Sequence, residues 1–162
     1  MKEFIYGRNP VYEALRAKRR QFFQLLVSEG AQEKGRLAEI IQMAQQQNVS
    51  VSRASHKRMD KIATNNQGVA LEVSGYPYHG VADILDRAEQ RGEPPFVLLL
   101  DTLQDPQNFG TLLRTAEAVG VHGVVIPLAR TAEITASVVN ASSGASEHLL
   151  IAQANLAQAI SS

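Results

Sequence analysis

Apolar positions in the first half of the chain recur with two different periods, which predicts alternating strands and helices. Residues 22–28 (FFQLLVS) form a short, mostly apolar run that is typical of a buried strand. The segments VSVS (49–52) and GVALEV (68–73) predict two further strands. Between the first two of these strands, apolar residues recur at helical spacing and predict an amphipathic helix, with Leu37, Ile40, Ile41 and Ala44 on its apolar face.

Two more helices are expected from residues that commonly begin a helix. Asn9 followed by Pro10 predicts an N-cap and first turn before VYEALRA, and Ser55 predicts the cap of a short helix that ends near Ile62. Because strands and helices alternate, residues 1–74 are expected to form a small α/β domain. The Gly- and Pro-containing stretch 75–79 is expected to be a linker to a second domain, residues 80–162.

The second half repeats the alternation with shorter strands. It predicts, in order, helix 81–91, strand 96–101, helix 110–119, strand 123–127 and helix 134–143. Short apolar strands separated by helices favour a parallel sheet with both faces covered. Ligands of such sheets bind at the carboxyl ends of the strands. The segment DTLQDPQNF (101–109) is expected at one of these ends, which makes it a candidate site.

Composition excludes several classes of protein. With 162 residues, of which 44% are hydrophobic, the chain can bury a core in one large or two small domains. It has no cysteine, which excludes disulfides and thiolate metal sites and favours a reducing, cytoplasmic location. Its longest uninterrupted apolar run, FVLLL, is far shorter than a bilayer span, and the first ten residues have no signal-peptide core. No membrane role is expected.

A net charge of zero conceals an asymmetry between the two halves. Residues 1–75 hold 12 Lys and Arg against 7 Asp and Glu, a charge of +5, and residues 76–162 hold 4 against 9, a charge of −5. All five lysines lie in the first half, where RAKRR and HKRMDK are basic clusters. Such clusters are suited to a polyanion such as RNA, although basic clusters are also common on solvated surfaces.

The candidate site combines residues that a simple helix does not need. Asn108 is predicted to accept a hydrogen bond from the first turn, with Pro106 stiffening the approach. Gly110, one turn before Arg114, is expected to leave that guanidinium unshielded beside a helix N-terminus, where an anion is favoured. An apolar stripe is expected to face the sheet, comprising Leu112, Leu113, Ala116 and Val119. A capped helix with one surface arginine is an equally good interpretation of this pattern alone.

Other familiar sites are absent from the sequence. The glycines match neither the dinucleotide-binding motif nor the P-loop motif, and no serine lies in a nucleophile elbow. The four histidines have no metal-ligand spacing, so no metal site is expected. The segment NASSGASE, with Glu147, is a tight helix end and only a weak candidate site.

A family resemblance adds what these patterns do not show. The segment DPQNFGTLLRTAEAVGVHGVVIP closely resembles the first signature of the SpoU family of RNA ribose 2′-O-methyltransferases, with Asn108, Gly110, Arg114 and Thr115 on its pattern positions. NASSGASEHL and ANLAQAI look like the segments that follow in that family. IYGRNPVYEAL and QGVALEV are similar to its N-terminal substrate-binding domain, which is akin to an RNA-binding ribosomal protein. The resemblance therefore covers the entire chain.

This resemblance implies a fold, a reaction and partners. It implies a ribosomal-protein-like RNA-binding domain followed by a parallel-sheet α/β domain with a C-terminal trefoil knot, working as a homodimer. The activity implied is methyl transfer from S-adenosylmethionine to a ribose 2′-hydroxyl, in large-subunit ribosomal RNA or sometimes tRNA. Substrate-binding residues are expected among the basic clusters, namely Arg8, Lys18, Arg19, Arg20, Lys57 and Arg58.

By position in the family pattern, Arg114 would activate the 2′-hydroxyl and Asn108 would hold Arg114 or the substrate, with Gly110, Thr115 and Glu147 supporting them. A free guanidinium stays protonated and is a poor general base. Arg114 is therefore expected to act either as that base or, instead, as a cation that stabilises the emerging alkoxide and binds the adjacent phosphate while a neighbouring anion assists proton removal. The sequence leaves both roles open.

The family's two later signatures, which supply most of the cofactor pocket and the knot, are not found before Ser162. We therefore expect cofactor-binding residues beyond Ser162, and a chain that is inactive alone. Two other hypotheses are a non-catalytic RNA-binding adaptor without the knot and an unrelated α/β small-molecule binder.

Overall fold

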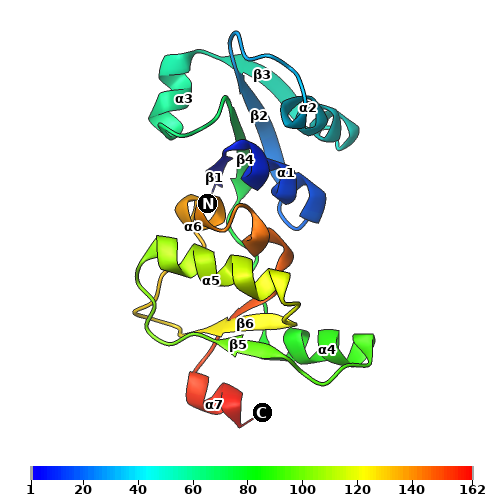
Figure 1. Cartoon of the computed structure of the whole chain (residues 1–162), viewed down its shortest axis with the longest axis vertical. Helices are drawn as coiled ribbons and strands as arrows, with labels where there is room; N and C mark the ends of the chain where they lie inside the picture. The colour runs from blue at the N-terminus through cyan, green and yellow to red at the C-terminus, as the bar shows by residue number, and fades with distance from the viewer. Residues whose placement is uncertain (1, 162) are drawn as a thin grey trace. The chain divides into compact units, whose positions relative to one another are not determined.

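The structure is a computed structural model that describes residues 2–161. Contacts divide the chain into two compact units, Met1–Tyr76 and Pro77–Ser162. The first unit contains β1 (Lys2–Tyr6), α1 (Arg8–Ala17), β2 (Phe22–Ser28), α2 (Arg36–Gln46), β3 (Ser50–Ala54), α3 (His56–Ile62) and β4 (Val69–Ser74). The second contains α4 (Val81–Arg91), β5 (Val97–Leu99), α5 (Pro106–Ala118), β6 (Gly123–Ile126), α6 (Ala136–Ala141), the 3₁₀ turn η1 (Ala145–His148), β7 (Ile151–Gln153) and α7 (Leu156–Ile160) (Figure 1).

The first unit is a four-stranded mixed sheet with helices on both faces. Its strand order is β1-β4-β2-β3; β4 is antiparallel to both of its neighbours, and β2 and β3 are parallel. Side chains alternate between faces along each strand. Leu26 and Ala70 therefore face α3, where they pack with Met59, and α1 and α2 cover the other face (Figure 1). The small α/β domain predicted from the sequence is confirmed.

The start of α1 differs from the prediction. The N-cap is Gly7, which makes no side-chain cap, and Asn9 lies inside the helix. Gly7 has φ 89°, a conformation that favours glycine. It allows α1 to begin at Arg8, directly after β1, whereas an Asn9 cap would start the helix at Pro10. By contrast, the predicted cap of α3 is confirmed, because the Ser55 side chain accepts a hydrogen bond from the Arg58 N–H.

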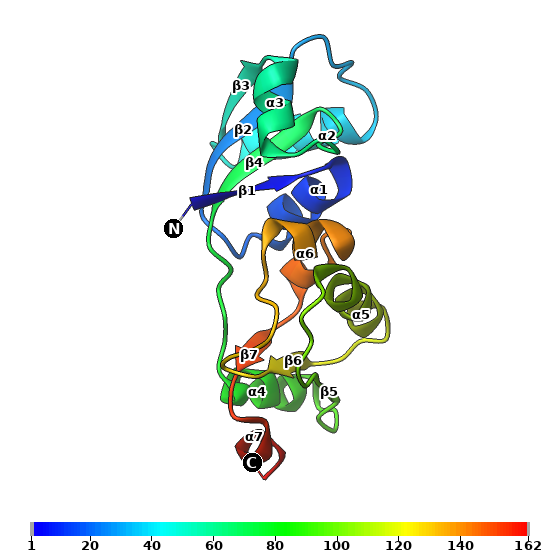
Figure 2. The same cartoon turned by 90° about the vertical axis from the view of Figure 1, so that its left-hand side faces the viewer.

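The second unit is a three-stranded parallel sheet, in the order β5-β6-β7. The helices α5 and α6 lie on one face, and α4 and α7 lie on the other (Figure 2). On the α4 face, Ile84 packs with Val125 and Ala152. Gly123 brings this helix close to the sheet, because a Cβ there would lie 2.5 Å from Ile84. The predicted parallel sheet with both faces covered is confirmed.

Two residues of the predicted linker take part in the second unit. The Tyr78 hydroxyl accepts a hydrogen bond from the Ile134 N–H at 2.9 Å, and His79 forms a parallel bridge with Ala152. These bonds fix the chain before α4 begins. No helix within residues 2–161 is long and apolar enough to cross a bilayer.

Candidate functional site

The candidate site of the second unit lies where the parallel strands end. Strands β5 and β6 finish at Leu99 and Ile126, and the loop after β5 leads directly into α5. This loop is hydrogen-bonded to the loop after β6, because the Leu103 carbonyl accepts from the Ala132 N–H at 2.7 Å and from the Thr131 hydroxyl at 3.1 Å. The start of α5 is therefore held at the carboxyl edge of the sheet, where α/β proteins bind their ligands.

The residue that caps α5 is Asp105, not Asn108. An Asp105 carboxylate oxygen accepts from the Asn108 N–H at 2.9 Å, and Pro106 is at the first helical position. Asn108 is therefore already helical, and its own side chain does not act as a cap. The signal was present in the sequence, since an acidic residue directly before proline is a typical helix start.

Gly110 has a different role from the one predicted. It is buried, and a Cβ at this position would lie 2.4 Å from the Ala141 Cβ and 2.8 Å from the Ser142 backbone nitrogen. The glycine thus allows α5 to pack closely against the end of α6. It does not serve to expose Arg114.

The apolar stripe of α5 is also displaced from the prediction. Leu113 and Ala116 are buried as expected, but Leu112 is 37% exposed and Val119 is 57% exposed. Phe109 is fully buried in their place. The buried face of α5 is therefore rotated around the helix toward Phe109 and Gly110, because Gly110, having no side chain, belongs to the packed face.

The three polar signature residues of α5 are all exposed. Asn108 and Thr115 share one side of the helix, and Arg114 is about 120° away around it, since each residue turns the helix by about 100°. The Thr115 hydroxyl donates to the Thr111 carbonyl at 3.2 Å. Among residues 2–161, the side chains of Asn108 and Arg114 have no hydrogen bond to each other or to another group. Both are therefore directed to solvent and available to a ligand.

Glu147, the remaining signature residue, is on the turn η1 and is only 2% exposed. It follows Gly144, whose φ of 88° allows the tight turn after α6. The hydroxyl of buried Ser142 donates to the Val139 carbonyl at 3.0 Å and joins Ser146 at 3.2 Å. This small-residue segment therefore packs beneath α5 and does not form an open surface.

A shallow hollow of about 330 Å³ adjoins the same carboxyl edge. Its polar side chains are Asp101 and Asn155, and its walls are Pro127, Leu128 and Leu156. Within the described part of the chain, no group of three His, Asp or Glu residues is arranged to hold a metal ion.

The predicted substrate-binding residues of the first unit lie at two opposite ends of its sheet. We call one of these the loop end: here β1, β2 and β3 finish and β4 begins, as shown by the pairs Tyr6–Ala70 and Ser28–Ala54. The other, which we call the opposite end, is marked by the pairing of Lys2 with Ser74. Strands of five to seven residues separate the two ends by about 17 Å or more.

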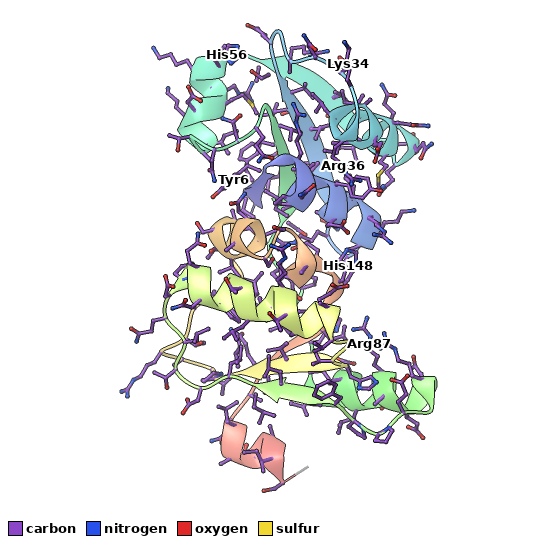
Figure 3. The ribbon with its side chains drawn as sticks, in the orientation of Figure 1. Tyr6, Lys34, Arg36, His56, Arg87 and His148 are labelled. Atoms are coloured by element: carbon purple, nitrogen blue, oxygen red, sulfur yellow. The ribbon has the colours of Figure 1, made fainter. Side chains whose placement is uncertain are left out.

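The loop end carries most of the accessible cations. Arg8 follows β1, Lys34 lies between β2 and α2, and Lys57 and Arg58 begin α3. Figure 3 shows Lys34 and His56 at this end of the unit. The Arg8 Nε donates to the Gln67 carbonyl at 3.3 Å, and Arg53 pairs with Glu33. Several cations on loops and on the first turn of a helix form a surface suited to phosphates.

At the opposite end, Arg20 does not fit the predicted role in substrate binding. Its side chain is fully buried, and its guanidinium pairs with Glu3 and donates to the Ser74 carbonyl at 3.0 Å. Lys18 is exposed, and Arg19 lies over the Tyr76 ring at 5.6 Å. Arg20 therefore stabilises the fold, and the other cations of the RAKRR cluster, Arg16, Lys18 and Arg19, remain at or near the surface.

Comparison with known proteins gives a consistent result for both units. Residues 4–79 match the family model for RNA 2′-O ribose methyltransferase substrate binding, and residues 95–162 match the SpoU rRNA methylase family. YacO of Bacillus subtilis, assigned to the TrmH family of tRNA/rRNA methyltransferases, is 38% identical over 98% of the chain. An uncharacterized tRNA/rRNA methyltransferase of Mycolicibacterium vanbaalenii is 37% identical over 98%. The chain spans 64% and 51% of these two proteins, respectively.

Solved structures show the same fold. An rRNA methyltransferase from Sinorhizobium meliloti with bound AdoMet has a TM-score of 0.71 at 22% identity, covering 99% of this chain and 57% of that one. The SpoU methyltransferase AviRb from Streptomyces viridochromogenes, also with AdoMet, has a TM-score of 0.70 at 19% identity, with coverages of 94% and 53%. The two family models together with these relatives show that the chain belongs to the SpoU family of methyltransferases.

Proposed function

We propose that the protein methylates RNA at a ribose 2′-hydroxyl, using S-adenosylmethionine as the methyl donor. The observation that carries this proposal is the exposed set Asn108, Arg114 and Thr115 on α5, a helix that begins at the carboxyl edge of a parallel sheet, in a chain matched by both SpoU models. The first unit would hold the RNA and the second would carry the reacting groups. Large-subunit ribosomal RNA is the substrate we favour, and tRNA is the alternative.

The chemistry requires that the ribose oxygen bond to the methyl carbon while the carbon–sulfur bond breaks and the hydroxyl proton passes to a base, which can be a neighbouring anion or water. Arg114 is exposed, so its guanidinium can approach both the 2′-oxygen and an adjacent phosphate. A protonated guanidinium stabilises negative charge that develops on the oxygen, and its planar fork matches a phosphate. Asn108, on a different side of α5, is proposed to orient the nucleotide.

The hollow at this edge of the sheet does not by itself form a complete cofactor pocket. The hollow beside Asp101 and Asn155 is shallow and offers one carboxylate and one amide, too few groups to enclose a nucleoside and an amino acid. We therefore assign no cofactor contact to residues 2–161. The relatives are longer than this chain, and we propose the cofactor-binding segments, the knot and the homodimer for proteins of that length. Methylation of these RNAs would place the protein in the cytoplasm.

The proposal is tested by incubating the protein with S-adenosylmethionine carrying a labelled methyl group and with ribosomal RNA or tRNA. A 2′-O-methyl group blocks cleavage of the next phosphodiester by alkali, so labelled nucleotides should be recovered as alkali-resistant dinucleotides. The assay is made with the 162-residue chain and with the longest reading frame that contains it. RNA binding without transfer in the longer protein would favour the non-catalytic adaptor. Label on a base would refute the 2′-hydroxyl as the target.

A further inference from the structure

Arg130 is an exposed cation on a loop next to the start of α5, and the proposed reaction gives it no role. The second unit has no lysine and four arginines. Arg87 and Arg91 are on α4, where both line a hollow with Glu117 and His148, and Arg87 donates to the His122 carbonyl. Arg114 is on α5, and Arg130 is on the loop between β6 and α6.

The loop that carries Arg130 is fixed on both sides of this residue. Immediately after it, the Thr131 hydroxyl and the Ala132 N–H both donate to the Leu103 carbonyl. Further along, the Ile134 N–H donates to the Tyr78 hydroxyl. Leu103 is two residues before Asp105, the cap of α5, so these bonds hold the Arg130 loop beside the helix that carries Asn108 and Arg114.

The backbone of Arg130 has an unusual conformation. Its φ is 61°, in the left-handed region, and on the facing loop Thr102 has a φ of 52°. Left-handed conformations are unfavourable for arginine and more so for a β-branched residue, and they persist where the surrounding contacts impose them, often at functional sites. Glycine or asparagine would adopt this backbone conformation more easily. The presence of arginine at position 130 therefore needs a reason other than local backbone geometry.

The charges around Arg130 supply that explanation. The loops at this edge carry Asp101, Asp105 and Glu133, all exposed, in a half of the chain with net charge −5. Such a surface repels an RNA backbone unless cations are placed at the point of approach. Among residues 2–161, the Arg130 guanidinium has no hydrogen bond or ion pair with these carboxylates, so it is available to an external anion.

We propose that Arg130 binds a phosphate of the substrate RNA next to the target nucleotide and thereby positions the ribose at Arg114. This inference rests on the proposed function. Arg130 is a positioning residue: the bidentate guanidinium–phosphate pair fixes the strand, and Arg114 acts on the reacting oxygen.

The test measures the affinity of the 162-residue chain for in vitro transcribed large-subunit ribosomal RNA at several salt concentrations. Arg130→Gln should weaken binding about three- to tenfold and reduce the slope of log affinity against log salt by about 0.7 to 0.9, the value for one lost phosphate contact. Arg130→Lys should recover the salt slope but only part of the affinity, because it keeps the charge and loses the fork. Arg91→Gln is the matched control: it removes one exposed arginine from the same unit and should change neither quantity.

A fourth variant separates binding from folding. Arg130→Gly relieves the left-handed backbone, so its melting temperature should equal or exceed that of the wild type, yet it should lose as much RNA affinity as Arg130→Gln. If the wild-type chain binds RNA and Arg130→Gln binds it with unchanged affinity and salt slope, this inference is wrong and the proposed function stands. If the wild-type chain shows no salt-dependent RNA binding, the RNA-binding role proposed for residues of this 162-residue chain is wrong, and the inference about Arg130 is wrong with it.

Discussion

Adjacent residues of the same type can have unrelated roles, as Arg19 and Arg20 show. Both belong to a basic cluster that suggests RNA binding, but Arg20 is buried against Glu3 and the Ser74 carbonyl. A buried guanidinium whose hydrogen bonds are satisfied is costly to replace, because its partners lose their bonds. The contribution of each cation therefore depends on its place in the sheet, which charge counts do not reveal.

This difference gives a prediction for stability. Arg20→Gln should lower the free energy of unfolding by about 2–3 kcal/mol, less than for a fully buried pair because the Glu3 side chain is 26% exposed. Arg19→Gln, one residue away, should change it by less than about 0.5 kcal/mol. Urea denaturation of both variants measures the difference, and equal midpoints would contradict the structural role of Arg20.

Arg114 is expected to show the reverse pattern, with a loss of activity and little change in stability. Its side chain is exposed and makes no bond within the described residues, so Arg114→Ala should keep the wild-type melting temperature. Methyl transfer should fall by about 10²- to 10³-fold, the loss typical when a group that stabilises a developing oxyanion is removed. Arg114→Lys should not restore the rate, because lysine lacks the planar fork. A large fall in melting temperature for Arg114→Ala would instead indicate that the residue is structural.

At the scale of helices and strands, the sequence predicted elements whose apolar pattern is long and regular. The segments 22–28 and 81–91 match β2 and α4 residue for residue. Strands β1 and β7 were not predicted: KEFIY lacks a clear apolar alternation, and IAQ is too short for a periodic pattern to be recognised. These strands depend on pairing with β4 and β6, which are distant along the chain.

The candidate site was predicted in part for the same reason. The family pattern located Asn108, Arg114 and Thr115, and their exposure on α5 agrees with a role toward a ligand. The role of Gly110 was misjudged because its neighbour Ala141 is 31 positions away, and local spacing along α5 contains no information about that contact. The apolar face of α5 shifted for the same reason.

Close packing of α5 on α6 leads to a prediction about Gly110. Alanine normally favours a helix over glycine by about 1 kcal/mol, but here its Cβ would lie 2.4 Å from the Ala141 Cβ. Gly110→Ala should therefore destabilise the chain by about 1–3 kcal/mol. Adding Ala141→Gly should recover part of this loss, because the nearest clash is removed while the Ser142 backbone contact remains.

Thr111→Ala, on the exposed side of the same helix, is the control and should be close to neutral. Thermal unfolding of the single and double variants provides the comparison. A stabilising effect of Gly110→Ala would mean that α5 and α6 are not as close as the structure shows.

At the scale of the whole molecule, positive charge is concentrated in the first unit, and most of what is accessible lies at its loop end. Arg8, Lys57 and Arg58 are there, whereas Lys2, Lys18 and Arg19 are at the opposite end, about 17 Å or more away. No single phosphate of an RNA can contact both sets. We expect the loop end to dominate, since Lys34, Arg53 and Lys61 add to it, whereas Arg16 and the buried Arg20 add to the opposite end.

Two triple variants of the 162-residue chain, each removing three positive charges, test this expectation. Changing Arg8, Lys57 and Arg58 to Gln should weaken binding to ribosomal RNA by about 10- to 100-fold at moderate salt and lower the salt slope by about 2, because counterion release scales with the phosphates contacted. Changing Lys2, Lys18 and Arg19 to Gln alters net charge by the same amount and should cost less than about fivefold. Long-range attraction depends on the net charge of the chain, whereas direct contact depends on where each charge lies. Equal losses of affinity in the two variants would therefore mean that RNA binding depends only on overall charge and that the loop end is not a specific binding surface.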